Sequence, residues 1–311
     1  MLIRSKVLGF CMGVRRAVEM TAEAIDAAAA FNAVPSPKDR NTTLYTLGPL
    51  IHNPQVLASL AGRGVKILEE TEIDNADAFT GSAVIILRAH GISPGVEQTL
   101  RKRKFRIIDA TCPRVKANQN TAFALAKKGY LVFLAGEKDH AELKGIYGYI
   151  MAGAAHLASP CIIVGNPEEA DHAAGKIKEQ ELRKNGGLFI KTALIGQTTI
   201  SGDEYRLIAE ALKEYFPDLE IKNTICDATR ERQNALRDLC SQVEAVVIAG
   251  GKDSANTRRL LSIAEDCGKP AWLAETAADL PPECRAFKTI GLCAGASTPD
   301  TVIDEIEQAL I

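Results

Sequence analysis

Short apolar runs, each ending at a glycine-containing polar loop, dominate the hydrophobic pattern of this chain. They are three to five residues long and rich in valine, isoleucine, leucine and alanine, which is typical of strands buried on both faces of a sheet. Histidine, serine, threonine or glutamine follows within a few residues of most runs. The runs cover residues 44–47, 83–87, 130–134, 193–195, 245–248 and 289–292.

Helical patterns alternate with the apolar runs. After Cys11 and after Cys112, apolar residues follow helical spacing over residues 14–25 and 115–126. Strands that alternate with helices predict an α/β fold with mostly parallel sheets, in which ligands bind beyond the carboxyl ends of the strands. The polar residues that follow the apolar runs therefore mark the expected site.

The chain also repeats part of its own sequence. Residues 112–142 align without a gap with residues 226–256, and ten of the 31 pairs are identical, where chance would give about two. Cys112 aligns with Cys226. An internal repeat of this kind indicates that similar structural units are joined in one chain.

A fainter third copy lies near the N-terminus and is led by Cys11. Its Gly48 and His52 have the same spacing as Gly136 and His140 in the second copy. We therefore predict three similar α/β domains around a pseudo-threefold axis, with the boundaries 1–111, 112–222 and 223–311.

One cysteine leads each predicted domain: Cys11, Cys112 and Cys226. Each lies at or just before the N-terminus of a predicted helix, where the helix dipole and free N–H groups favour a thiolate. Three thiolates that meet on one axis would suit iron. A repeated scaffold whose cysteines only pack explains the repeat as well, so the repeat alone leaves both interpretations open.

Composition narrows the function classes. Lysine plus arginine number 37 and aspartate plus glutamate 39, so the net charge of −2 gives no general reason to bind nucleic acid or anionic lipid. Hydrophobic residues make up 46% of the chain, as in ordinary globular proteins, and no apolar run approaches the length of a membrane helix. The eight cysteines include no Cys-x-x-Cys pair, which leaves zinc-ribbon and thioredoxin motifs unsupported.

Seven segments together resemble the 4-hydroxy-3-methylbut-2-enyl diphosphate reductase family, also called IspH or LytB. They occur in the family's order along nearly the whole chain, and their combination is highly specific although each alone is weak. The segments are 9–17 (GFCMGVRRA), 48–53 (GPLIHN), 88–94 (RAHGISP), 109–113 (DATCP), 197–199 (QTT), 225–229 (ICDAT) and 294–300 (AGASTPD).

The resemblance implies an iron–sulfur oxidoreductase of the non-mevalonate pathway of isoprene biosynthesis. Such enzymes remove a hydroxyl group from an allylic diphosphate with two electrons and two protons, and they form isopentenyl and dimethylallyl diphosphate. The implied fold is a cloverleaf of three α/β domains around a central 4Fe–4S cluster. By position, the implied cluster ligands are Cys11, Cys112 and Cys226, which leaves one iron open to the substrate hydroxyl.

The resemblance also assigns the proton chemistry. Glu142 is the implied proton donor, because protonation turns the departing hydroxyl into water. The competing interpretation of Glu142 is a solvated carboxylate in a loop. Thr198 is implied to hydrogen-bond the substrate hydroxyl or to relay a proton to it, and His140 to share the proton path.

Neutral donors and histidines are implied to bind the diphosphate, because they satisfy its oxygens without a bulky cage of arginines. They are His52, His90, His140, Thr198, Ser254, Ala255, Asn256 and Ser297. The chain departs from the family at Ala255, where a serine is common, so one hydroxyl is lost there while the backbone N–H remains. It also has Ala141 where the family has a proline between His140 and Glu142.

The expected partners follow from the same resemblance. No Gly-x-Gly-x-x-Gly fingerprint for a nicotinamide cofactor occurs, so electrons are expected from an external carrier of the ferredoxin or flavodoxin type. We expect a cytoplasmic protein that binds neither nucleic acid nor membranes.

Two other classes of protein stay open. The first is another enzyme with an open-iron cluster, such as a dehydratase or a quinolinate synthase-like enzyme, although loops 88–91 and 294–297 argue against it. A dehydratase would not need an electron donor. The second is an iron–sulfur sensor or a triplicated binding scaffold, which would not need Glu142.

Overall fold

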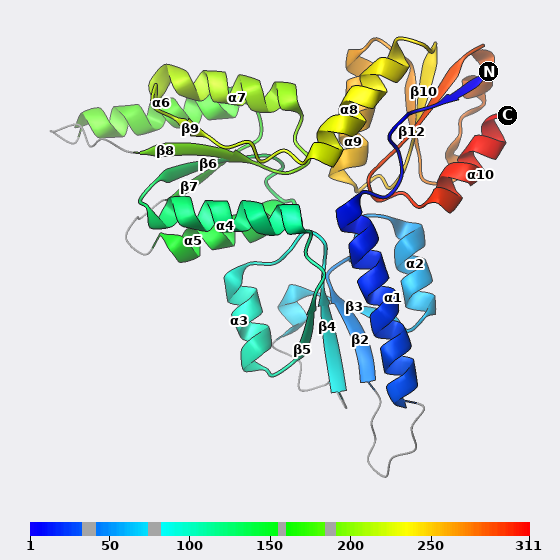
Figure 1. The fold of residues 1–311 in the computed structure, drawn as a ribbon. Coiled ribbons are helices and arrows are strands. Elements are labelled where there is room, and N and C mark those ends of the chain that lie inside the picture. The colour runs from blue at the N-terminus through cyan, green and yellow to red at the C-terminus, as the bar shows by residue number, and fades with distance from the viewer. Residues whose placement is uncertain (33–41, 74–81, 155–159, 184–190) are drawn as a thin grey trace. The chain divides into compact units, whose positions relative to one another are not determined.

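The computed structural model describes residues 1–32, 42–73, 82–154, 160–183 and 191–311 (Figure 1). These residues form two compact units. Unit 1 contains Met1–Ala89, Lys102–Cys112 and Asp227–Ile311, and unit 2 contains His90–Arg101 and Pro113–Cys226. The predicted domain boundaries near residues 111 and 222 stay a prediction.

Three four-stranded sheets make up the framework, two in unit 1 and one in unit 2, and all their described pairings are parallel. The predicted α/β fold is thereby confirmed. In order across each sheet, the strands are β3 (Val65–Leu68), β2 (Thr42–Leu47), β4 (Ser82–Leu87) and β5 (Arg106–Asp109) in the first; β7 (Cys161–Val164), β6 (Leu131–Ala135), β8 (Thr192–Gly196) and β9 (Glu220–Ile221) in the second; and β11 (Ala271–Ala274), β10 (Ala245–Ala249), β12 (Ile290–Ala294) and β1 (Leu2–Arg4) in the third.

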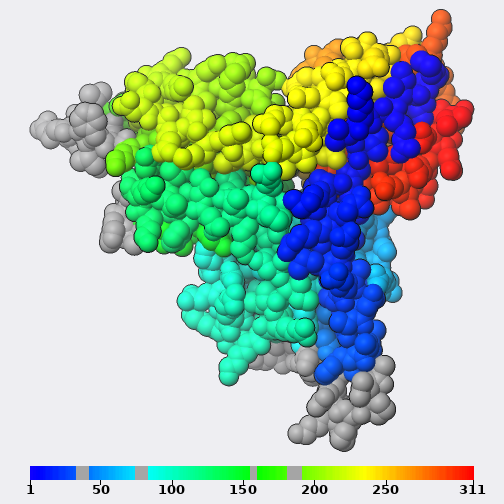
Figure 2. All heavy atoms as spheres, viewed as in Figure 1, coloured from blue at the N-terminus to red at the C-terminus, as the bar shows by residue number. Residues whose placement is uncertain are grey.

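The third sheet is completed by the N-terminal strand of the chain. Leu2 of β1 pairs with Ile290 of β12, and Arg4 pairs with Leu292. Figure 2 shows this N-terminal segment in blue against the C-terminal residues in orange and red. With β1 in this place, all three sheets have the same strand order, and a cysteine follows the last strand of each: Cys112 after β5, Cys226 after β9 and Cys11 after β1.

Helices cover the sheets and bury their apolar side chains. In unit 2, Phe133 of β6 packs toward α6 and α7, whereas its neighbours Val132 and Leu134 pack toward α4 and α5. Successive side chains of a strand point to opposite faces, so a strand covered on both faces must be apolar throughout. The helices are α1 (Met12–Asn32), α2 (Pro54–Gly62), α3 (Pro94–Lys102), α4 (Pro113–Lys127), α5 (Ala141–Gly153), α6 (Pro167–Arg183), α7 (Gly202–Tyr215), α8 (Asp227–Cys240), α9 (Ala255–Asp266) and α10 (Asp300–Leu310).

Glycines shape the turns that lead from the central strands to the polar loops. Gly136 follows β6 with φ of +146°, and its repeat partner Gly250 follows β10 with φ of +145°. L-residues with a side chain rarely adopt this backbone conformation. There is also no room for a side chain at position 250, because a Cβ on Gly250 would lie 2.7 Å from Thr298 Oγ1. Within the described part of the chain, no helix combines the length and apolarity needed to cross a membrane.

We expect Phe133→Ala to lower the free energy of unfolding by about 3–5 kcal/mol, because it leaves a cavity in the core of unit 2. Phe133 is fully buried, and its ring lies 5.7 Å from that of Phe216. Phe123 on α4 is 37% exposed and provides the matched control, with an expected loss below about 1 kcal/mol for Phe123→Ala. Urea unfolding followed by circular dichroism measures both, and equal losses would contradict the assignment of Phe133 to the core.

Candidate active site

The three repeated cysteines begin helices, as predicted. Cys11, Cys112 and Cys226 directly precede α1, α4 and α8. The backbone N–H of each cysteine donates a hydrogen bond to a carbonyl two residues beyond the end of a central strand. These bonds join Cys11 N to Ala296 O (3.0 Å), Cys112 N to Ala89 O (2.9 Å) and Cys226 N to Thr198 O (3.0 Å). The three cysteines therefore have equivalent positions in the three sheets.

None of these three cysteines is in a disulfide, and all three are partly buried. In unit 1, a Cβ on Gly13 would lie 2.4 Å from the Sγ atom of Cys112. The first turn of the helix led by Cys11 therefore touches the side chain of Cys112, and only a glycine leaves the space for it. Accessible thiols at helix N-termini are the donor type that iron–sulfur clusters require.

Cysteines outside the repeat positions have different surroundings. Burial raises the pKa of Cys161 to about 12 and that of Cys293 to about 11. Burial also raises the pKa of Cys240 to about 12. These groups stay protonated at neutral pH, and a protonated thiol is a poor metal ligand.

Unit 2 places Glu142 in the first turn of α5, where its side chain is 1% exposed. Both carboxylate oxygens accept hydrogen bonds from one residue that follows β8. Thr198 N lies 2.7 Å from Oε1, and Thr198 Oγ1 lies 2.8 Å from Oε2. The interpretation of Glu142 as a solvated loop carboxylate is wrong, since the group is buried and held at both oxygens.

Burial also changes the acidity of this carboxyl group. Desolvation raises the pKa of Glu142 from 4.5 to about 7, although the hydrogen bonds from the backbone and side chain of Thr198 act in the opposite direction. Removing a carboxylate from water disfavours its charged form, and here that effect exceeds the stabilisation by two hydrogen bonds. Near neutral pH, Glu142 is therefore able both to hold and to release a proton.

Two histidines lie beside this carboxyl group within unit 2. His140 caps α5, and its Nδ1 atom accepts a hydrogen bond of 3.2 Å from the backbone N–H of Glu142. Because Nδ1 is the acceptor, the neutral ring carries its proton on Nε2. The ring of His90 meets that of His140 edge-on, with centroids 5.2 Å apart and an angle of 89°.

Close packing against α5 sets the segment that follows His90. A Cβ on Gly148 would lie 2.4 Å from the Cβ atom of Ser93, and one on Gly145 would lie 3.6 Å from the carbonyl of Ile92. Helix α5 therefore carries Glu142 at its start and seats this segment along its side. The distance at Gly145 is ordinary van der Waals contact, whereas the absence of a side chain on Gly148 is what lets Ser93 approach the helix.

Unit 1 brings together a second group of predicted site residues, at the N-terminus of α9. Ser254 caps the helix through its Oγ atom, which accepts from Thr257 N at 3.3 Å. Ala255 and Asn256 are the first two helical residues, and both are buried. The free N–H groups and the dipole at a helix start favour an anion such as phosphate.

The side-chain amide of Asn256 is a buried polar group that a ligand could bond to. It is 4% exposed, and neither its Nδ2 nor its Oδ1 atom has a hydrogen-bond partner among the described residues. Leaving a buried amide unbonded costs about 1–3 kcal/mol. A bound ligand that accepts from Nδ2 would remove that cost.

His52 and Ser297 complete this group in unit 1. Ser297 Oγ donates a hydrogen bond of 3.0 Å to the backbone carbonyl of His52. The same carbonyl leaves no space for a side chain on Gly251, whose Cβ would lie 2.7 Å away. The loops after β2, β10 and β12 are thus packed together at the carboxyl ends of their strands.

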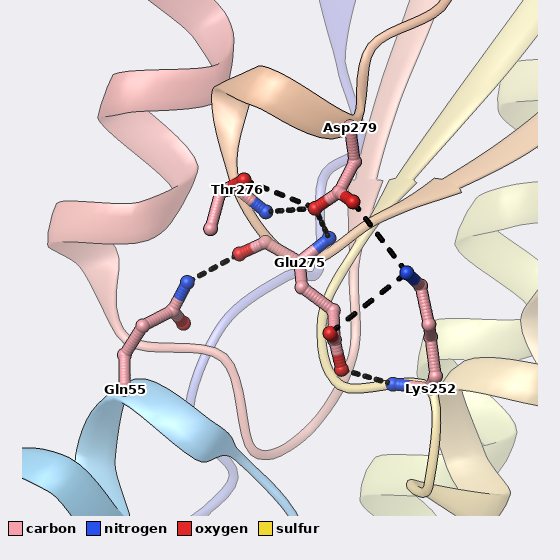
Figure 3. A network of polar contacts seen from close by, with 5 residues as sticks. All are labelled: Gln55, Lys252, Glu275, Thr276 and Asp279. Atoms are coloured by element: carbon pink, nitrogen blue, oxygen red, sulfur yellow. Dashed lines mark hydrogen bonds and ion pairs between the residues drawn. The ribbon is translucent and has the colours of Figure 1, made fainter.

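A network of polar contacts supports the loop before Ser254 (Figure 3). Glu275 Oε1 accepts from Lys252 N at 2.8 Å, and Asp279 Oδ1 lies 3.4 Å from Lys252 Nζ. Asp279 Oδ2 accepts from the backbone N–H of Thr276 at 2.8 Å, and Gln55 of α2 donates to the carbonyl of Glu275 at 2.5 Å. The identity of Lys252 with Lys138 is the sequence signal for this network, whose acidic members lie outside the repeated segment.

Comparison with known proteins identifies the family to which this chain is similar. The family model described as LytB protein matches residues 2–311. A 4-hydroxy-3-methylbut-2-enyl diphosphate reductase of Treponema denticola is 44% identical over 99% of this chain and 98% of its own length. The protein of the same name from Aquifex aeolicus is 34% identical over 99% of this chain and 95% of its own length.

Solved structures lead to the same group of proteins. The E-1-hydroxy-2-methyl-but-2-enyl-4-diphosphate reductase of Plasmodium falciparum has a TM-score of 0.82 and 28% identity, and the match covers 99% of this chain and 87% of that one. A structure described as (E)-4-hydroxy-3-methyl-but-2-enyl diphosphate reductase, the terminal enzyme of the non-mevalonate pathway, has a TM-score of 0.65 and 33% identity. That match covers 99% of this chain and 98% of the other.

We expect the raised pKa of Glu142 to make stability depend on pH. The folded chain holds this proton more tightly than the unfolded chain, so the contribution is complete below about pH 4.5 and is lost as the pH rises to about 7. A pKa difference of this size corresponds to about 3 kcal/mol. Urea unfolding at several pH values should show this loss in the native chain and not in Glu142→Gln.

A matched control separates this effect from other titrating groups. Glu168 is also the second residue of its helix, α6, but it is exposed. Glu168→Gln should therefore keep the loss of stability between pH 4.5 and 7. The same pH dependence in Glu142→Gln and in Glu168→Gln would show that Glu142 does not titrate from a buried position.

Proposed function

The chain belongs to the LytB protein family, and we propose that it reduces 4-hydroxy-3-methylbut-2-enyl diphosphate to isopentenyl and dimethylallyl diphosphate. This is the terminal step of the non-mevalonate pathway of isoprene biosynthesis. The reaction replaces a C–O bond by a C–H bond and consumes two electrons and two protons, with water as the second product. The buried Glu142–Thr198 pair is the observation that carries the proposal, because this reaction needs a proton at the departing oxygen.

We propose that Cys11, Cys112 and Cys226 hold a 4Fe–4S cluster with one open iron. Three partly buried cysteines outside any disulfide, at equivalent helix starts, support this ligand set, as does the contact between Gly13 and Cys112. When bound, the cluster would supply the electrons and a Lewis-acidic iron for the substrate hydroxyl.

Glu142 supplies the proton through Thr198. The threonine hydroxyl has one hydrogen to donate and two lone pairs that accept. When Glu142 is protonated, its O–H donates to Thr198 Oγ1, 2.8 Å away, and the hydroxyl hydrogen of Thr198 turns toward the substrate oxygen. A pKa near 7 lets the carboxyl group take up the next proton at neutral pH.

The histidines complete the proton path and the diphosphate site. His140 keeps its Nε2 proton for a diphosphate oxygen, because Nδ1 accepts from the N–H of Glu142. Asn256 and Ser254 with the first N–H groups of α9 offer neutral donors to the same group. Ser297 becomes a further donor when its hydroxyl hydrogen turns from the carbonyl of His52 to the ligand. His52, His90 and the backbone N–H of Ala255 are the remaining proposed contacts.

An external electron carrier is required by the stoichiometry. Each turnover consumes two electrons, and the side chains of the protein are not a renewable source of electrons. We propose a small redox protein of the ferredoxin or flavodoxin type as the donor. A requirement for such a donor also separates this reaction from that of a dehydratase, which has no net electron demand.

Iron and sulfide analysis tests the ligand set. After anaerobic reconstitution we expect about four iron and four sulfide per chain. Serine at position 11, 112 or 226 should lower both values, because an alcohol is a much poorer ligand for iron than a thiolate. Cys267→Ser is the control, since Cys267 is exposed and outside the repeat, and it should keep the full content. Full iron content in Cys226→Ser would contradict the ligand assignment.

The rate of turnover with a chemical reductant tests the proposed role of Glu142 as the proton donor. Glu142→Gln keeps the size of the side chain but has no proton of suitable acidity, so we expect a fall in kcat of about 100-fold or more with the iron content unchanged. Glu168→Gln should turn over at the native rate. Native kcat in the reconstituted Glu142→Gln chain would remove Glu142 from the mechanism.

A further inference from the structure

Polar side chains on the three cysteine-led helices reach the backbone that sets another cysteine. On α1, Arg16 lies five residues after Cys11. Its Nη1 atom donates to the carbonyl of Thr111 at 3.2 Å, and its Nη2 atom donates to that of Asp109 at 3.4 Å. Thr111 directly precedes Cys112, so the helix of the first cysteine holds the segment that carries the second.

The helix of the second cysteine makes a corresponding contact within unit 2. Asn118 on α4 is 4% exposed, and its Nδ2 atom donates to the carbonyl of Gly196 at 2.8 Å. Gly196 ends β8, and its own N–H donates to Thr224 Oγ1 at 2.8 Å. Two residues after Gly196, the backbone carbonyl of Thr198 accepts the hydrogen bond from the N–H of Cys226.

The helix of the third cysteine returns to the first within unit 1. Arg232 on α8 is 2% exposed, and its Nη2 atom donates to the carbonyl of Gly9 at 2.7 Å. Gly9 lies two residues before Cys11 and has a φ of +78°. In the repeat, Arg232 aligns with Asn118. The contacts therefore follow a cyclic order. The helix led by Cys11 contacts the segment of Cys112, the helix led by Cys112 contacts the strand end next to the Cys226 segment, and the helix led by Cys226 contacts the segment of Cys11.

We propose that Arg16, Asn118 and Arg232 are positioning residues that hold the three cysteine segments in their ligand geometry before any iron is bound. The inference rests on the proposed function, because it concerns the same three thiols. Each contact is made to a backbone carbonyl, so it fixes the path of the segment without involving the thiol. Burying a guanidinium such as that of Arg232 is costly, and its hydrogen bond to Gly9 offsets part of that cost.

The physical consequence is pre-organisation. A loop that must be ordered at the moment of binding loses conformational freedom then, and this loss weakens binding. A loop already held by a side chain has lost that freedom on folding. Replacing a residue that hydrogen-bonds to a metal-ligand segment typically lowers metal affinity by about 10- to 100-fold.

Iron release measures the effect on the loaded protein. In reconstituted chains under an excess of a ferrous chelator, we expect Arg232→Met to lose iron about 10- to 100-fold faster than the native chain. Arg232→Lys, which keeps one donor and the charge, should recover part of the difference. Asn118→Ala and Arg16→Met should act in the same direction.

Each helix offers an exposed control of the same residue type. These controls are Arg15→Met on α1, Asn120→Ala on α4 and Arg230→Met on α8. They should release iron at the native rate. Because Arg230 and Arg232 lie on one helix, the comparison separates the contact with Gly9 from a general effect of charge near Cys226.

Amide hydrogen exchange in the iron-free chain tests the same idea without a cluster. In Arg232→Met the N–H of Cys11, which donates to Ala296 O, should exchange about tenfold faster, while amides of strand β6 stay as protected as in the native chain. This readout also shows whether the variant is folded. Faster exchange at Cys11 with native protection elsewhere supports the proposal.

Failure of the two proposals would look different. If the native chain bound no iron, the proposed cluster would be wrong, and the exchange of the Cys11 amide would still decide the positioning role. If the native chain bound iron but Arg232→Met released it at the native rate with unchanged exchange at Cys11, the positioning role would be overturned and the cluster would stand.

Discussion

The hydrogen bond from each cysteine N–H to a carbonyl beyond a central strand is the constraint on which the site depends. It occurs three times, with lengths of 2.9–3.0 Å. Each bond fixes a helix N-terminus at the carboxyl end of a parallel sheet, where polar loops from several strands gather. The thiol, the helix dipole and the loop are therefore set by a single contact in each sheet.

The repeat keeps this frame and varies the chemistry placed on it. Glu142 and Asn256 are both the second residue of a helix that follows a central strand, α5 or α9. The carboxyl group of Glu142 is buried against two donors of Thr198, which makes it an acid of moderate strength. The amide of Asn256 is buried with no described partner, which makes it ready for a ligand. One position thus holds a buried carboxyl group in one unit and a buried amide in the other, and we propose proton transfer for the first and ligand binding for the second.

The pairing of β1 with β12 gives the third sheet the same form as the other two. Without Leu2–Arg4, that sheet would have three strands, and Cys11 would not follow the last strand of a sheet as Cys112 and Cys226 do. Strand β1 pairs through backbone groups that every residue except proline carries, so its three residues complete the sheet without a distinctive side-chain pattern. The supporting network of Lys252, Glu275 and Asp279 belongs to the same unit and steadies the loop between β10 and α9.

Local and repeated sequence signals were sufficient to predict the central strands, the cysteine-led helices and the family of this protein. Apolar runs predicted the central strands β2, β4, β6, β8, β10 and β12, because a strand covered on both faces has to be apolar throughout. The repeat predicted equivalent cysteines at helix starts, and the motifs predicted the family. These signals are local, or they recur at a fixed spacing along the chain.

Three features became visible only in the folded chain: the pairing of β1 with a strand nearly the whole chain away, the burial of Glu142, and the contacts of Arg16, Asn118 and Arg232. A pKa depends on how much water and charge surround a group, and a contact with a backbone carbonyl depends on where distant segments pack. Neither quantity is written in the residues next to it, since both arise from neighbours that folding brings together.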